Sequence, residues 1–192
     1  GLVEAVKVAL LKDPEFFKSL ENTSKDLAAG NLNLISHCIH RSAELHTLHI
    51  TQGGDPFELG SARPLDLGHW VAHKCEALSK YRLTHGQAVA IGLAVDVLCA
   101  RELGLFSQKD SARVIELLVN LGFSLYAPEL DLDEGSLLMQ GLEEFREHLG
   151  GKLTLIFPTA IGQSTFVHQL SPEVVRKVVA ELRQKFSCAV LS

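Results

Sequence analysis

The sequence predicts a mainly α protein, a helical bundle with one small β-hairpin. Apolar residues recur at three- and four-residue intervals over most of the 192-residue chain, as on the buried face of a helix. Apolar and polar residues alternate only in two short stretches near the C-terminal end, Lys152 to Phe157 and Ser164 to His168. Because no repeat or linker divides residues 1–192, we expect a single helical domain.

Proline, glycine and capping residues set the expected boundaries of the elements. A first helix ends or kinks at Pro14, a short second helix follows, and a third fades near Thr51. Gln52 to Ala62 reads as a loop because it is rich in glycine and proline. Further helices are expected from Pro64 to about Ser79, from Thr84 (with Gln87 reaching back to cap it) to Gly104, from Ser107–Asp110 to Gly122, from Asp133 to Gly150–Gly151, and from Ser171 onward.

Composition argues against several classes of partner. The net charge of -5 disfavours nucleic acid, which usually requires a basic face. The longest apolar stretch, Ala88 to Ala100, contains Asp96 and is shorter than the roughly 20 residues that a bilayer requires, so we expect no membrane partner. The mean hydropathy of +0.15 is typical of a soluble globular chain. Four scattered cysteines without a C-x-x-C pair indicate reduced thiols and a cytoplasmic location.

Histidines and acids gather in the helix expected from Pro64. Asp66, His69, His73 and Glu76 follow i, i+3, i+7, i+10 spacing, which places them on one face. A solvated face explains Glu76 taken alone, whereas two histidines beside an acid favour a site. Spacing alone selects His69 and His73 as a metal-chelating pair. A zinc hydrolase would need a glutamate between them, as in H-E-x-x-H, and none is present.

Other candidate residues carry little information on their own. Glu4 and Lys7 stand one turn apart, like a common surface ion pair worth a few tenths of a kcal/mol, roughly. His85 stands at the start of a helix, where histidines are ordinary.

The order of several motifs resembles the 3-dehydroquinate synthase family. Gly1 to Lys7 resembles the family's G-x-A-E-x-x-K segment, and Leu65 to Glu76 resembles its L-N-x-G-H-T-x-G-H-A-x-E helix. His85 to Gly92 is similar to the H-G-E-A-V-A-x-G turn, and Leu155 to Gly162 is similar to the family's hairpin. The similarity runs in register over nearly the whole chain, so it implies the helical C-terminal domain of that fold.

The resemblance implies a catalytic metal site that differs from the choice made by spacing. The family's motif glutamate and two motif histidines, which hold one Zn²⁺ (or Co²⁺), fall on Glu4, His69 and His85. Three protein ligands leave a coordination position open for substrate. His73 then becomes a substrate-contacting residue that assists proton transfer, and Lys7 matches the family's substrate-binding lysine.

Several substrate positions depart from the family pattern. Asp66 falls where the family has an asparagine, Arg63 neighbours the position of an arginine, and His46 falls near that of a lysine. The family's D-K-K stretch is replaced around Phe145 to His148, where Arg146 or His148 could substitute for the lysine. In addition, Trp70 replaces a small hydroxyl residue and Gln87 replaces a glutamate. Such changes suggest a different substrate, so a cyclase that acts on another sugar phosphate fits the sequence as well as 3-dehydroquinate synthase itself.

The implied activity is that of an NAD-dependent sugar phosphate cyclase, a carbon–oxygen lyase. In the family, phosphate elimination and an intramolecular aldol closure convert a sugar phosphate into a carbocycle. The NAD site lies mainly in an N-terminal α/β domain that would precede Gly1, and the chain, which starts without methionine, lacks a Gly-rich phosphate loop. We therefore expect no turnover from the isolated chain, and a homodimer as in the family. The alternative is a non-catalytic helical scaffold or binding module derived from this family.

Overall fold

The computed structural model describes residues 1–52 and 64–187, and it consists of helices and one antiparallel hairpin. In chain order the elements are α1 (Leu2–Lys12), α2 (Pro14–Ala28), α3 (Leu32–Gln52), η1 (Pro64–Asp66), α4 (His69–Leu78), α5 (His85–Glu102), α6 (Gln108–Asn120), η2 (Pro128–Leu130), η3 (Leu132–Gly135), α7 (Ser136–His148), β1 (Leu155–Ala160), β2 (Gln163–Val167) and α8 (Pro172–Phe186), where η marks a 3-10 helix. The mainly α class with one hairpin is confirmed.

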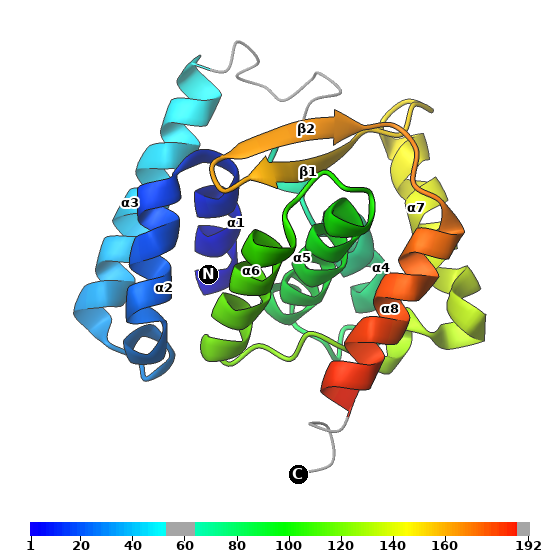
Figure 1. Ribbon diagram of the computed structural model, residues 1–192, viewed down its shortest axis with the longest axis horizontal. Coiled ribbons are helices and arrows are strands. Elements are labelled where there is room, and N and C mark those ends of the chain that lie inside the picture. The colour runs from blue at the N-terminus through cyan, green and yellow to red at the C-terminus, as the bar shows by residue number, and fades with distance from the viewer. Residues whose placement is uncertain (53–63, 188–192) are drawn as a thin grey trace.

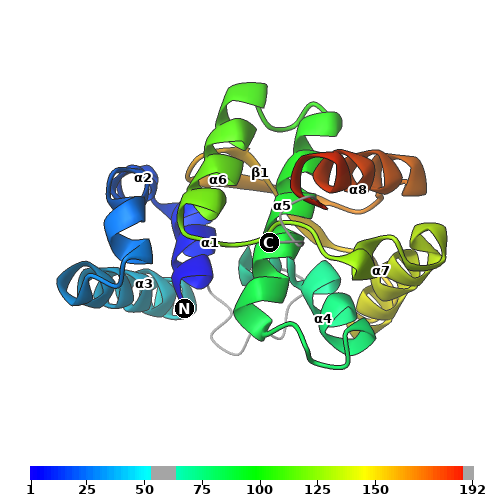
Figure 2. The same cartoon turned by 90° about the horizontal axis from the view of Figure 1, so that it is seen from below.

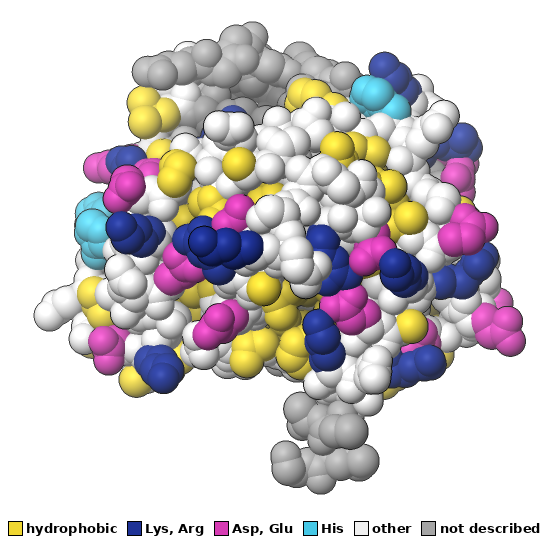
Figure 3. All heavy atoms as spheres, viewed as in Figure 1, with side chains coloured by type: hydrophobic (Ala, Val, Ile, Leu, Met, Phe, Trp, Pro, Cys, Tyr) yellow, Lys and Arg dark blue, Asp and Glu magenta, His cyan; other side chains and the backbone are white. Residues whose placement is uncertain are grey.

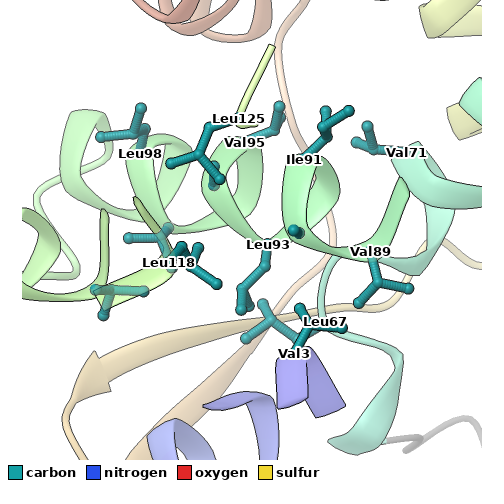
Figure 4. Packing of buried hydrophobic residues seen from close by; sticks show 14 of the residues in the cluster. Val3, Leu67, Val71, Val89, Ile91, Leu93, Val95, Leu98, Leu118 and Leu125 are labelled. Atoms are coloured by element: carbon teal, nitrogen blue, oxygen red, sulfur yellow. The ribbon is translucent and has the colours of Figure 1, made fainter. Parts of the chain in front are cut away.

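Helix α5 is the central element. It contacts α1, α4, α6, α8 and β1, with α1 to α3 on one side of it and α7 and α8 on the other (Figures 1 and 2). Every residue from Ala88 to Ala100 is buried, and small residues such as Gly92 let neighbouring helices approach closely. Leu93 points toward α1, whereas Ile91 points to the opposite side of α5 (Figure 4). An apolar helix that packs all round is the expected core of such a bundle.

The turn of the hairpin lies at the junction of α1 and α2, beside Pro14, and its strands contact α1 and α5. Its strands pair from Leu155 opposite Val167, with an irregularity after Pro158. The N–H of Gly162, at the turn, donates to the carbonyl oxygen of Leu10 (2.7 Å), which anchors the turn on α1. Both strands were predicted, but β1 begins and ends three residues later than expected, because Pro158 is tolerated within an edge strand.

One predicted helix is divided in the structure. Instead of running from Pro64 to Ser79, the chain forms η1, turns through Gly68 in the left-handed region (φ 81°), and begins α4 at His69. The N–H of Gly68 donates to the buried carboxylate of Asp96 (2.6 Å) rather than continuing a helix. As a result, Asp66 precedes α4 and does not share one helical face with His69.

Smaller differences affect the other predicted boundaries. Helix α2 is longer than the short helix expected. Helix α7 begins at Ser136 rather than near Asp133, because Asp133 and Glu134 adopt left-handed conformations in η3. The cap of α5 is confirmed, since Gln87 Oε1 accepts the backbone N–H of Thr84 (2.9 Å).

The described surface mixes charges of both signs. On the face formed by α6 and α8, basic and acidic side chains lie side by side (Figure 3), for example Arg101 with Glu181 and Arg113 with Glu21. Opposite charges thus neutralise one another across this face. Within the described ranges, every helix is too short or too polar to cross a bilayer.

Candidate metal centre

Three predicted metal ligands converge from the first turns of three helices. Glu4 lies in the first turn of α1, His69 is the first residue of α4, and His85 is the first residue of α5. One ligand atom of each lies within 4.8 Å of the other two. Two ligand atoms bound tetrahedrally to one zinc at about 2.1 Å are ~3.4 Å apart, so chelation requires these side chains to close by at most about 1.4 Å. In the part of the chain that the structure describes, this is the one such group.

The ring of His69 is held neutral. Its Nδ1 lies 3.3 Å from the carbonyl oxygen of Leu67, which accepts a hydrogen bond from Nδ1–H in the tautomer that leaves Nε2 unprotonated. Burial of the imidazole, and then the nearby Lys7 cation, lower the pKa of His69 to about 4. Neutral imidazole is the form that coordinates a metal, so His69 needs to lose no proton near neutral pH.

Glu4 is only partly satisfied by the protein. Its Oε2 pairs with Lys7 Nζ at 2.5 Å, and the Lys7 side chain is only 4% exposed. Its other oxygen, Oε1, is buried and has no hydrogen-bond partner among the described residues. A buried carboxylate oxygen without a partner is costly, so the arrangement favours a ligand for Oε1. The ion pair expected at the surface from spacing thus has a buried lysine, although the Glu4 side chain is 38% exposed.

Two cavities flank His69 and hold most of the predicted substrate residues. One, of about 340 Å³, is lined by Lys7, His46 and Asp66 together with Glu4 and His69. The other, of about 360 Å³, is shared by Asp66, His69 and His73 and extends to the end of α7. The lining of the second cavity, besides these three residues, consists of Trp70, Lys74, Gly141, Glu144, Phe145 and His148.

One predicted substrate residue, Arg146, lies away from these two cavities. Arg146 pairs with Glu143 on the surface of α7 (2.7 Å) and does not line either cavity beside His69. His148, which the sequence offered as its alternative, does line the second cavity. Its Nδ1 lies 2.7 Å from the carbonyl oxygen of Glu144. Arg63 lies outside the described residues.

Sequence reasoning missed the position of Glu76. Treated alone, it was interpreted as part of a solvated face, but its side chain is only 14% exposed. One carboxylate oxygen lies 3.2 Å from His85 Nδ1 and the other 3.4 Å from His73 Nδ1. The one-turn spacing from His73 was the available signal. The contact with His85 could not be read, because it depends on how α5 packs on α4.

Asp96 of α5 is a second residue that sequence reasoning missed, and it supports the start of α4. Asp96 is buried in α5, and its oxygens accept the N–H of Gly68 (2.6 Å) and the indole N–H of Trp70 (2.8 Å). Burial raises the pKa of Asp96 to about 7, although both hydrogen bonds oppose the shift. Gly92 also approaches Gly68 so closely that a Cβ on it would lie 1.9 Å from the Gly68 carbonyl oxygen. These contacts fix the direction in which His69 leaves the turn.

The sequence matches the family described as 3-dehydroquinate synthase C-terminal over residues 1–143. This span includes the first turns of α1, α4 and α5. The chain belongs to this family.

Characterised relatives are sugar phosphate cyclases. The chain is 31% identical over 188 residues to 2-epi-valiolone synthase of Actinosynnema mirum, covering 95% of this chain and 48% of the relative. It is similar in structure to the 2-epi-5-epi-valiolone synthase ValA of Streptomyces hygroscopicus subsp. jinggangensis 5008, solved with NAD⁺ and Zn²⁺ (TM-score 0.85, 25% identity, 96% of this chain and 50% of the other). A 2-deoxy-scyllo-inosose synthase, solved with carbaglucose-6-phosphate, NAD⁺ and Co²⁺, shares the fold (TM-score 0.60, 18% identity, 94% and 51% covered). The chain thus spans about half the length of these relatives.

Proposed function

We propose that this chain is the metal-binding catalytic half of an NAD-dependent sugar phosphate cyclase, with Glu4, His69 and His85 as the ligands of one divalent ion. The observation that carries the proposal is the convergence of these three side chains, with Glu4 Oε1 buried and unpartnered. Two imidazoles and a carboxylate suit Zn²⁺ or Co²⁺. The relatives solved with these ions support the same choice. Bound there, the ion would supply Lewis acidity at an open coordination position.

The chain's own residues would bind and orient a sugar phosphate beside that ion. The buried ammonium of Lys7 borders the first cavity and can donate to a substrate oxygen. Asp66 borders both cavities and His46 the first, so they can contact hydroxyls of the substrate. His73 lines the second cavity and would move a proton to or from a substrate that extends past His69.

Several parts of the proposal rest on the resemblance and on the relatives. NAD would be bound mainly by a domain outside these residues, so we predict no turnover from the chain alone. Phosphate elimination and aldol cyclisation would follow the family reaction. Arg63 and Arg146 remain predicted substrate contacts. A homodimer and a cytoplasmic location also remain predictions from the family and from cysteine usage.

Metal content of the purified chain tests the proposal directly. After loading with Zn²⁺ and desalting, we expect about one ion per chain by elemental analysis, and almost none in Glu4→Gln or His85→Ala. His37→Ala removes an exposed histidine of α3 and serves as the matched control, since it should retain the ion. Circular dichroism would establish that each variant is folded. A folded wild-type chain that binds no metal would instead favour a scaffold that has lost the family's chemistry.

The substrate class requires a separate experiment on the longest natural protein that contains this chain. With NAD⁺ and Zn²⁺ present, a panel of sugar phosphates would be screened for release of inorganic phosphate. We expect release from at least one substrate, and loss of release in Lys7→Ala. Unchanged release in that variant would remove Lys7 from the substrate site.

A further inference from the structure

Glu76 is placed between two histidines that have different roles in the proposed site. Its Oε1 lies 3.2 Å from Nδ1 of His85, and its Oε2 lies 3.4 Å from Nδ1 of His73. Each oxygen therefore faces one ring, and both rings turn the same nitrogen toward the carboxylate. Among the described residues, Glu76 forms no ion pair with a lysine or arginine. A carboxylate that is 14% exposed and directed at two imidazoles is unlike a solvated surface charge.

The His69 ring also turns its Nδ1 toward an acceptor oxygen. His69 Nδ1 faces the carbonyl oxygen of Leu67 at 3.3 Å. Both candidate ligand histidines thus have an acceptor at Nδ1, a backbone carbonyl for His69 and a carboxylate for His85. An acceptor at one ring nitrogen keeps the proton there and leaves the other nitrogen free to coordinate.

We infer that Glu76 is a positioning residue that holds His85 and His73 in the Nδ1–H tautomer, with both Nε2 atoms turned away from it. For His85 this presents Nε2 to the ion, and for His73 it presents Nε2 to the substrate cavity. This inference rests on the proposed function for its consequence, metal affinity, but not for the ring orientation itself. A residue of α4 thereby links the metal ligand at the start of α5 to the proton-transfer histidine.

The ring tautomers can be measured in the metal-free chain by long-range nitrogen–proton NMR at about pH 8, where an imidazole of ordinary pKa is neutral. In the wild type, we expect His85 and His73 to be in the Nδ1–H form. In Glu76→Ala, we expect both rings to shift toward the Nε2–H form that free imidazole prefers. Glu143→Gln, which alters an exposed carboxylate of α7, should leave both rings unchanged. Unchanged tautomers in folded Glu76→Ala would overturn the inference, whether or not the chain binds metal.

Zinc affinity, measured by competition with a chromophoric chelator, gives the functional consequence. We expect Glu76→Ala to weaken binding about 10- to 100-fold, the usual effect of removing a carboxylate behind a ligand histidine. In Glu76→Gln the amide can accept from only one of the two rings, so a smaller loss is expected. A changed Co²⁺ absorption spectrum would show altered ligand geometry, which a general loss of stability would not produce.

The two readouts separate this inference from the proposed function. If the wild type binds no zinc but its tautomers depend on Glu76, the metal site is wrong and the ring positioning stands. If zinc binds at Glu4 and His85 with wild-type affinity in every folded Glu76 variant, the proposed site stands and the positioning role is wrong.

Discussion

Two carboxylates close to His69 in the fold, Asp96 and Glu4, have opposite environments. Asp96 lies behind the start of α4, and both of its oxygens accept hydrogen bonds from N–H groups of the protein. Glu4 lies in front, where one oxygen pairs with Lys7 and the other has no partner in the described structure. A buried carboxylate whose oxygens both accept hydrogen bonds holds the backbone in place. A carboxylate with an oxygen that has no hydrogen-bond partner can still bind a metal ion or another ligand. Asp96 therefore supports the backbone next to the proposed metal site, whereas Glu4 belongs to that site.

The largest effect is expected from disturbing the support where backbones touch. Gly92→Ala would place a Cβ 1.9 Å from the Gly68 carbonyl oxygen. Because neither backbone can yield cheaply, we expect a loss of about 3 kcal/mol or more in the free energy of unfolding. The matched control is Gly86→Ala in the same helix, whose Cβ would meet only a Val3 methyl carbon at 3.8 Å. Urea denaturation of both variants checks this, and equal stabilities would contradict a close backbone contact between Gly92 and Gly68.

Exchanging the two acids for amides should give opposite results. Asp96→Asn places an NH₂ group against one of two donors, so we expect about 2 kcal/mol of lost stability, with one zinc still bound at saturation. Glu4→Gln should abolish zinc binding while the chain stays folded. Stability by denaturant titration and metal by elemental analysis would be measured on the same samples. Loss of metal in folded Asp96→Asn would break the distinction between the two regions.

Stability of the metal-free chain should depend on pH in a way that separates Asp96 from His69. The pKa of Asp96 is raised to about 7 in the fold, so the folded state holds a proton that the unfolded state has released. The contribution of Asp96 to the free energy of unfolding is therefore fully present below about pH 4 and is lost as the pH rises through 7. The pKa of His69 is lowered to about 4, so its contribution is full above about pH 6.5 and lost as pH falls toward 4.

Variants isolate these two slopes. As the pH rises from 4 to 7, the free energy of unfolding of Asp96→Asn should fall less than that of the wild type, or should rise. His69→Asn should show the reverse difference between about pH 4 and 6.5. Thermal or urea unfolding at half-unit pH steps provides the curves. Parallel curves for wild type and both variants would mean that neither group has a shifted pKa.

The smallest effect is expected outside both regions. Arg146 pairs with Glu143 at the surface of α7, and both side chains are largely exposed. Arg146→Ala should change the free energy of unfolding by less than about 0.5 kcal/mol, since exposed ion pairs contribute little. Zinc affinity should stay at the wild-type value. A weaker affinity would place Arg146 closer to the site than its ion pair indicates.

The sequence by itself determined the helical class, the hairpin and most helix ends, because apolar periodicity, Pro14 and the Thr84 cap act within a few residues of the chain. The order of the motifs also pointed to Glu4, His69 and His85. Spacing alone had selected His69 with His73, without Glu4 or His85. The tertiary structure decided what depends on contacts between helices. The break at Gly68 follows from Asp96, and the contact of Glu76 with His85 follows from the packing of α5 on α4. Local patterns carry no information about which distant group will compete for a backbone N–H or face an imidazole, because that competition exists only once the helices are packed.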